Sequence, residues 1–149
     1  MSLTLLYEHV VFAPKHRAPC LLPEKEEMLF LYIWGIVKRQ GCALIRVNAA
    51  LDHIHLLLRR HPSLSTSELV AHIKRASSLW IGREKVFPGF PGWSREYAAF
   101  SVSHRELGAV RDYVAGQKEH HRLVSFMDEY LSLVPPEMRE NVKAEYFND

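Results

Sequence analysis

The segment His53–Arg59 constrains the fold more than any other part of the sequence, because it reads His-Ile-His-Leu-Leu-Leu-Arg. Successive side chains of an extended strand point to opposite faces of a sheet. One face of the predicted strand therefore carries Ile54, Leu56 and Leu58, and the other carries His53, His55, Leu57 and Arg59. We expect helices to pack on the aliphatic face, which leaves the histidine-bearing face for another element to cover or use.

The predicted elements follow one another in the order β-α-β-β-α-β-α. Runs of β-branched and aromatic residues predict strands over 5–12, 44–50, 53–59 and 97–103. Helical periodicity and end signals predict helices that begin at Pro23, after Ser65 and after Ser103. Between the second helix and the last strand, two prolines and two glycines in residues 86–93 predict an irregular loop. This order is typical of an α+β protein: a ferredoxin-like or RRM-like β-α-β-β-α-β core with an antiparallel sheet, plus a C-terminal helix.

Length and composition favour a single domain over residues 1–149, with a core over about 4–122 and a helical, acidic tail over about 123–149. Residues 1–126 carry a net charge of +6 and residues 127–149 a net charge of −4, a balance that permits a polyanionic partner. The longest apolar run, residues 28–37, has ten residues, too few to span a membrane. Two cysteines exclude a disulfide framework and a four-thiolate zinc site, and we expect a reduced cytoplasmic protein.

Two groups of polar residues are candidates for a shared site. His53 and His55 lie two residues apart on one strand face, about 6.6 Å along the strand, so both imidazoles can lean toward one ion. Tyr113, Gln117 and His121 are spaced i, i+4, i+8 on the third helix and share one helical face, with His120 close by. Taken separately, each group is more simply explained as ordinary, partly exposed side chains.

Together these residues make chemical sense as a metal-dependent nucleophilic site. Two neutral imidazoles and one amide oxygen suit a divalent ion, and we expect Mg²⁺ or Mn²⁺ with open positions for a substrate. Tyr113 lies one helical turn before Gln117, where its hydroxyl could attack a phosphodiester whose charge the ion stabilises. The products would be a phosphotyrosyl link to nucleic acid and a free 3′-hydroxyl. The rival tyrosines, Tyr97 and Tyr130, have no ligand-type residue four positions on.

Several blocks of the sequence resemble, in order and spacing, the single-tyrosine HUH transposases of IS200-like insertion sequences and the related repeat-associated tyrosine transposases. The resemblance covers about residues 4–131. The matching pieces are Val10–Lys15, Asp52–Leu58, Ile73–Ser78, Trp93–Ser103 and Tyr113–His121. The specific part is the combination of Asp-His-hydrophobic-His with a downstream Tyr-x-x-x-Gln.

The resemblance implies a role for each of these residues. His53 and His55 would be metal ligands and Gln117 the third ligand. Tyr113 would be the nucleophile that cleaves single-stranded DNA and becomes linked to its 5′ phosphate, in DNA transposition. Family members bind imperfect hairpins at element ends and form homodimers, and burial of an otherwise uncovered sheet face and edge also predicts a dimer here.

Contacts to DNA phosphates are expected from three basic pairs, although each pair is equally compatible with a solvated surface. The candidates are Lys15, Arg17, Arg59, Arg60, Lys74 and Arg75. His120 and His121 are auxiliary candidates for proton transfer or ligation. Two other functions remain open at this point: a ferredoxin-like protein that binds a nucleic-acid hairpin without cutting it, and a two-histidine hydrolase that uses water.

Overall fold

The computed structural model describes residues 2–120 and 126–140. Its core is a four-stranded sheet with the order β2-β3-β1-β4, antiparallel at every pairing. The central strands are β1 (Tyr7–Phe12) and β3 (His53–Arg59), and the edge strands are β2 (Ala43–Ala50) and β4 (Ala98–Val102). With one helix after β1 and one after β3, this is the predicted ferredoxin-like arrangement, and the α+β prediction is confirmed.

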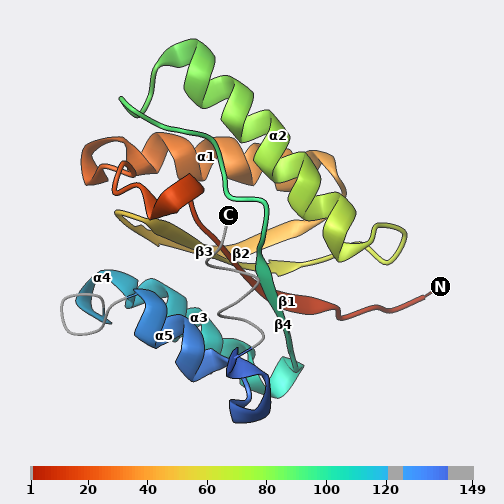
Figure 1. The fold of residues 1–149 in the computed structure, drawn as a ribbon. Helices are drawn as coiled ribbons and strands as arrows, with labels where there is room; N and C mark the ends of the chain where they lie inside the picture. The colour runs from red at the N-terminus through yellow and green to blue at the C-terminus, as the bar shows by residue number, and fades with distance from the viewer. Residues whose placement is uncertain (1, 121–125, 141–149) are drawn as a thin grey trace.

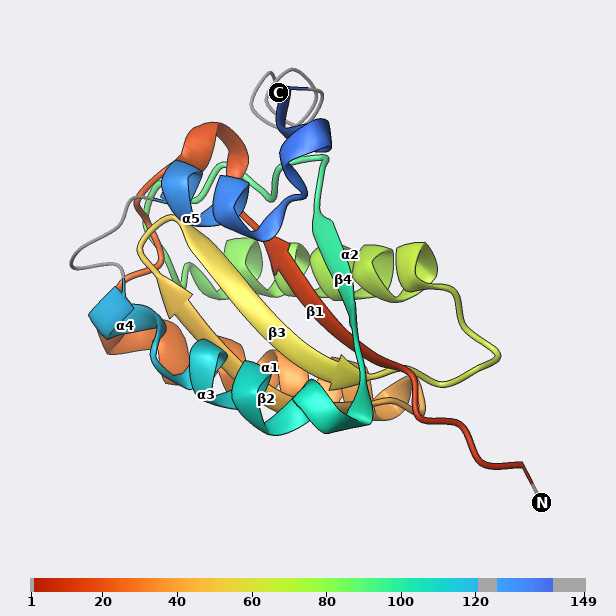
Figure 2. The same cartoon turned by 90° about the horizontal axis from the view of Figure 1, so that it is seen from below.

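Helices cover both faces of the sheet (Figure 1). On one face lie α1 (Pro23–Arg39) and α2 (Thr66–Glu84). On the other lie α3 (Leu107–Ala115), α4 (Gln117–His120) and α5 (Phe126–Leu133). Seen from below, α3 runs beside β2, whereas α5 crosses the end where β1 finishes and β3 begins (Figure 2). The histidine-bearing face is therefore covered by the chain's own C-terminal helices, so an uncovered sheet face no longer supports the predicted dimer.

The two large helices follow from local signals. Pro23 opens α1, where its missing N–H is not needed, and the helix buries Leu29, Ile33, Ile36 and Val37. The turn after α1 needs a left-handed residue, which Gly41 supplies with a φ of 74°. Before α2, the Ser65 hydroxyl accepts a hydrogen bond from the Glu68 backbone N–H at 3.1 Å, as its capping pattern predicts.

The main core lies between the sheet and the α1–α2 layer. It includes Ile54, Leu56 and Leu58 of β3, all fully buried, and the predicted irregular loop adds Phe87 and Trp93. The opposite face holds two smaller apolar clusters. One packs Val11 and Ala98 against Tyr130 and Val134 beside α5, and the other packs Leu57 against Val114 of α3.

Three predicted boundaries need correction. The first strand begins at Tyr7 rather than at residue 5, and the last covers Ala98–Val102 rather than 97–103. The third helix, predicted to run unbroken from Ser103 through Gln117, is instead a 3₁₀ turn (His104–Glu106), α3 and then α4. The break falls at Gly116, the residue type, apart from proline, that least favours a helix interior.

Parts of the predicted site and tail lie outside the description. His121 and residues 141–149 of the acidic tail are not among the described residues, and His120 is described only as part of the α4 backbone. Within residues 2–120 and 126–140, every helix is too short or too polar to cross a membrane.

Candidate active site

Strand β3 places His53 and His55 side by side on the face covered by α3–α5. Both side chains are fully buried, and their ring centroids lie 5.1 Å apart. This position follows from the alternation of side chains along the strand, so the predicted face of both histidines is confirmed. Neighbouring β1 presents its odd-numbered residues to the same face, which brings buried His9 to within 2.8 Å of His55, between Nε2 of His9 and Nδ1 of His55.

A buried carboxylate faces both histidines. Glu129 Oε1, on α5, lies 3.3 Å from His53 Nε2 and 3.1 Å from His55 Nε2. The other carboxylate oxygen, Oε2, accepts a hydrogen bond from the Tyr113 hydroxyl. Glu129 thus joins the histidine pair of β3 to the tyrosine of α3 within one chain.

The remaining ring nitrogens are held by partners that turn both Nε2 atoms inward. His53 Nδ1 donates to Asp52 Oδ1 at 2.8 Å. The same tautomer for His55 has Nδ1 donating to Nε2 of His9, which requires His9 to be a neutral acceptor. Burial, and then the neighbouring His55, lower the pKa of His9 from 6.5 to about 3, so His9 is neutral near pH 7. Both Nε2 atoms therefore point at Glu129 Oε1, and replacing their protons by a metal ion would use the arrangement that outer-shell partners give to metal-binding histidines.

Acidic neighbours counteract the effect of burial on the pKa of His53. Burial alone lowers the pKa of a histidine, but hydrogen bonds and charges of Asp52 and Glu129 outweigh it, and the pKa of His53 is raised. A cation between these groups is thus favoured by the surroundings, whether it is a proton or a metal ion.

Tyr113 is half-buried at the edge of this cluster, with its ring centroid 6.0 Å from that of His55. Burial and the Glu129 carboxylate raise the pKa of the Tyr113 hydroxyl, while a hydrogen bond from the Gln117 amide lowers it. The net shift is upward, so in the described arrangement Tyr113 is a neutral phenol.

The donor set fits a divalent metal ion. Ligand atoms of His53, His55 and Glu129 all lie within 4.8 Å of one another, and two imidazoles with a carboxylate suit Mn²⁺ and similar ions. The second observation is Gln117 Oε1, a fully buried oxygen with no hydrogen-bond partner among the described residues. A buried amide oxygen without a partner is costly, and ligation of an ion would relieve that cost.

The sequence-based choice of Gln117 as the third ligand stays a prediction, and the structure adds Glu129 as a competing or additional one. The side chain of Gln117 is fully buried, and its Nε2 donates a hydrogen bond to the Tyr113 carbonyl oxygen at 3.3 Å. The two residues predicted to share a helical face therefore still meet, although the helix is interrupted between them.

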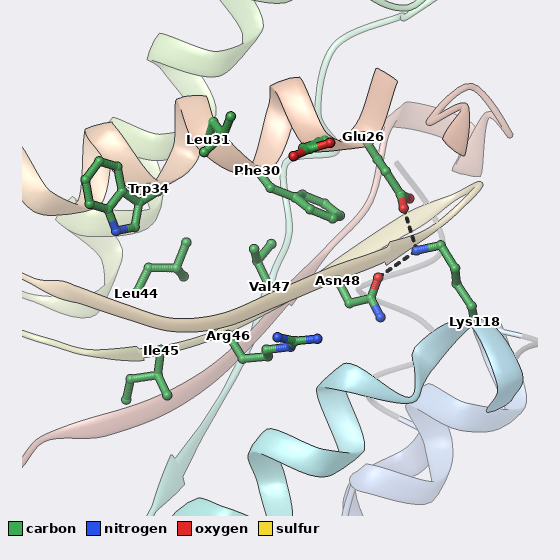
Figure 3. Close-up of a pocket in the computed structure, with 11 residues that line it drawn as sticks. Glu26, Phe30, Leu31, Trp34, Leu44, Ile45, Arg46, Val47, Asn48 and Lys118 are labelled. Carbon is green, nitrogen blue, oxygen red and sulfur yellow. Dashed lines mark hydrogen bonds and ion pairs between the residues drawn. The ribbon is translucent and has the colours of Figure 1, made fainter. Parts of the chain in front are cut away.

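A polar clamp holds the α3–α4 junction against the edge of the sheet (Figure 3). Asn48 of β2 donates to the Ala115 carbonyl oxygen at 3.0 Å. Lys118 donates to Asn48 Oδ1 at 2.7 Å and pairs with Glu26 of α1 at 2.7 Å. These contacts place Gln117, which lies immediately before Lys118, under the sheet.

The six basic residues predicted to contact phosphate do not gather at one place. Lys15 and Arg17 lie in the turn after β1, at the same end of the sheet as His53, whereas Arg59 ends β3 about 20 Å away along the strand. Arg60 pairs with Glu8 at 2.5 Å, and Lys74 donates to the Ser94 and Glu96 carbonyl oxygens at 2.8 and 2.9 Å. Arg75 is exposed on α2, and a DNA-contacting role for any of the six remains a prediction.

The rival tyrosines have surroundings different from those of Tyr113. Tyr130 is buried in the apolar cluster beside α5, and burial with the nearby Glu96 raises its pKa to about 12. Tyr97 packs against the main core and lies below the Lys74 ammonium group, 5.5 Å from the ring centroid.

Sequence reasoning missed His9 and Glu129. Alternation along β1 could have assigned His9 to the odd-numbered face, but its contact with His55 depends on how β1 and β3 are paired. Glu129 lies 74 residues from His55, in an acidic region with no spacing signal toward the histidines. Only the packing of α5 brings this carboxylate to the site.

Comparison with known proteins gives a consistent result. The profile of the family described as "Transposase IS200 like" matches residues 2–117. The chain is 28% identical over 133 residues to the transposase for insertion sequence element IS200 of Salmonella typhimurium, which covers 86% of this chain and 84% of that protein. It is 25% identical over 117 residues to the ISDra2 transposase TnpA of Deinococcus radiodurans, and this alignment covers 74% of this chain and 83% of that protein.

Two solved structures share the fold. A crystal structure of a protein assigned as a transposase of Deinococcus radiodurans R1 superposes with a TM-score of 0.63 at 24% identity, covering 78% of this chain and 93% of that one. A REP-associated tyrosine transposase bound to a REP hairpin superposes with a TM-score of 0.63 at 13% identity, covering 83% and 73%.

Proposed function

This chain belongs to the IS200-like transposase family, and we propose that it cleaves and rejoins single-stranded DNA through a covalent link between Tyr113 and a 5′ phosphate. The observation that carries the proposal is the convergence of Tyr113 with His53 and His55 around the Glu129 carboxylate in one chain. A phenol beside a cation site is the combination that attack on a phosphodiester requires.

We propose that His53, His55 and Glu129 hold a divalent ion, Mg²⁺ or Mn²⁺, with Gln117 Oε1 as a further donor. Such an ion, when bound, polarises a phosphodiester oxygen and stabilises the charge that develops during attack. Asp52 and His9 hydrogen-bond to Nδ1 of His53 and of His55, respectively, which turns both Nε2 atoms toward the proposed ion.

Within this scheme the Tyr113 hydroxyl stays protonated in the absence of DNA. Its proton already points at Glu129 Oε2, which provides an acceptor as the phenolic oxygen bonds to phosphorus. The bond from phosphorus to the 3′ oxygen breaks, and that oxygen takes up a proton to leave as a 3′-hydroxyl. Since one phosphodiester replaces another, the reverse reaction rejoins strands without a further energy source.

We propose hairpin-forming single-stranded DNA as the substrate and a second copy of the chain as the protein partner. The first part is supported by the structural neighbour, which is described as bound to a REP hairpin. The turn that carries Lys15 and Arg17 offers positive charge at the end of the sheet where His53 lies, where a strand approaching Tyr113 would carry phosphates.

The test is a cleavage assay on 3′-labelled single-stranded oligonucleotides spanning the hairpins that flank the gene, with Mn²⁺ or Mg²⁺. The 5′-phosphate fragment retains the label, so a covalent adduct appears as a labelled protein band in a denaturing gel. We expect this band with the wild type, its disappearance with Tyr113→Phe, and its retention with the matched control Tyr97→Phe.

Other outcomes would redirect the proposal. Hairpin binding without any wild-type adduct would favour a binding protein that cuts nothing. Cleavage that persists in Tyr113→Phe would instead favour a hydrolase that uses water as the nucleophile.

A further inference from the structure

The loop after α2 repeats one tripeptide, because residues 87–93 read Phe-Pro-Gly-Phe-Pro-Gly-Trp. In each copy the proline fixes its own φ at about −65°, and the glycine has a positive φ, 76° at Gly89 and 97° at Gly92. Proline followed by a glycine with positive φ is the pattern of a type II turn. The backbone N–H of Phe90 closes the first turn by donating to the Phe87 carbonyl oxygen at 3.2 Å. The loop is therefore irregular in outline but conformationally restricted.

A pocket of about 400 Å³ lies between the first of these turns and the last turn of α2. It is lined by Ile81, Gly82 and Lys85 of the helix end and by the four residues of the turn, 87–90. This set is referred to below as the Phe90 pocket. Its volume falls within the range of about 300–1,000 Å³ that is typical of sites for small ligands.

The walls of the Phe90 pocket are apolar and leave open space. A Cβ atom added at Gly82 would meet no atom within 4 Å. The ring of Phe90 is half-buried and packs edge-on against Trp93, with 5.0 Å between centroids and 77° between planes. Trp93 in turn packs edge-on against Phe12 of the core at 4.8 Å. Because Phe90 is already held in place, a flat ligand that stacks on it pays little for ordering the ring.

An exposed cation stands beside these apolar walls. Of the lining residues, all within the described part of the chain, Lys85 is the charged one. It ends α2 in the left-handed conformation, with a φ of 51°, at a helix position that glycine usually occupies because other residues disfavour a positive φ. The chain thus places an ammonium group at the pocket despite a backbone cost. The neighbouring Arg83 is paired with Glu84 at 3.2 Å.

The loop is fastened to the end of the sheet where the histidine site lies. The Lys15 backbone N–H donates to the Gly92 carbonyl oxygen at 2.9 Å, and in both views the loop passes the turn after β1 (Figures 1 and 2). That turn carries Lys15 and Arg17, at the end of the sheet where His53 begins β3. A single strand that runs from the Phe90 pocket to Tyr113 would pass these basic residues.

We propose that the Phe90 pocket binds one unpaired nucleotide of the DNA substrate, with the base against the Phe90 ring and a phosphate beside Lys85. The chemistry of the lining carries the choice of ligand: apolar walls with an aromatic ring suit a base, and a single cation suits a single phosphate. Among the lining residues there is no carboxylate to repel that phosphate. The inference rests on the single-stranded DNA substrate of the proposed function, but not on the chemistry at Tyr113.

Fluorescence anisotropy of the full chain with the hairpin oligonucleotides of the adduct assay tests the pocket. EDTA in the buffer prevents cleavage, so that binding alone is measured. Each unpaired nucleotide is replaced in turn by an abasic site, which removes the base and keeps the phosphate. We expect one position at which this replacement weakens wild-type binding by about 5- to 100-fold, the range for loss of one base–aromatic stack.

The variant Gly82→Leu fills the pocket without disturbing the fold, because its side chain enters open space and glycine is a poor residue inside a helix. It should bind the intact oligonucleotide as weakly as the wild type binds the abasic one, and the abasic site should weaken its binding no further. The matched control is Gly35→Leu, at a glycine of α1 with the same open surroundings. This control should keep both the affinity and the abasic sensitivity of the wild type.

Salt dependence tests the phosphate contact separately. Lys85→Gln should reduce the slope of log affinity against log salt concentration by about 0.7, the value for one phosphate contact on a single strand. Lys25→Gln, at an exposed lysine of α1, is the matched control and should leave the slope unchanged.

The outcomes distinguish this inference from the proposed function. A wild type without any abasic-sensitive position would overturn the Phe90 pocket, and so would sensitivity that survives in Gly82→Leu with its fold verified by circular dichroism. In both cases the adduct on Tyr113 would still support strand cleavage. A wild type that neither binds the oligonucleotides nor forms the adduct would overturn the proposed function together with this inference.

Discussion

The face of the sheet under α1 and α2 is packed with aliphatic and aromatic side chains. The face under α3–α5 instead carries three buried histidines, a glutamate and a glutamine between two small apolar clusters. Strand β3 contributes to both faces: Leu56 lies in the main core, and the adjacent His55 lies in the polar site. One strand therefore serves stability with one set of alternate residues and chemistry with the other.

The comparison shows why the polar face is more interconnected. An aliphatic core needs only shape and area, whereas each buried polar group costs free energy unless it has a partner. His53 has Asp52, His55 has His9, and Tyr113 has Glu129. Among the described residues, Gln117 Oε1 has no such bond, and we propose this oxygen as a further donor to the metal ion.

The largest effect on stability is expected from Leu56→Ala, on the sheet face under α1 and α2. Removing a fully buried leucine side chain should lower the free energy of unfolding by about 2–5 kcal/mol. Urea unfolding measures this loss, and the adduct assay on the folded variant should show the chemistry retained. If Leu56→Ala instead abolished the adduct in fully folded protein, the separation of the two faces would be wrong.

An intermediate effect, on metal binding, is expected from a substitution of His9 on the sheet face under α3–α5. His9→Phe removes the acceptor behind His55 and should weaken Mn²⁺ binding by about 10–100-fold, the usual cost of losing an outer-shell partner. Titration calorimetry with Mn²⁺ measures the change. His9→Gln keeps an acceptor oxygen and is the matched control, with an affinity expected to lie closer to that of the wild type.

The smallest effect is a pH dependence of the metal-free protein. The pKa of His9 is about 3 in the folded chain and 6.5 when exposed, so between these values the unfolded chain binds a proton that the native state does not. His9 therefore lowers the free energy of unfolding as pH falls below 6.5, by at most about 1.4 kcal/mol per pH unit. His53, whose pKa is raised, acts in the opposite sense: its stabilisation is full below the unfolded pKa and is lost as pH rises through the folded one.

Urea unfolding in EDTA at pH 6.5 and pH 5 separates the two histidines. Wild type should lose about 1–2 kcal/mol more than His9→Phe over this interval. Equal losses in both proteins would show that His9 is not buried in its neutral form.

Much of the framework could be predicted from local patterns. Alternation placed His53 and His55 on one face, Pro23 and Ser65 marked helix starts, and residues 86–93 form the expected irregular loop. The prediction of an unbroken third helix was wrong. It followed the helical spacing of apolar residues over 107–117, and one glycine, Gly116, leaves that spacing almost unchanged although the helix breaks there.

What the sequence by itself determined is the division of β3 into an aliphatic and a histidine face, since side-chain alternation is a property of the extended backbone. The identity of the groups that meet those histidines was decided by tertiary structure. Glu129 reaches them because its neighbour Tyr130 packs on Val11 and Ala98, which seats α5 over the end of the sheet. Such a contact joins residues more than seventy positions apart, and no local pattern in the chain encodes the packing that creates it.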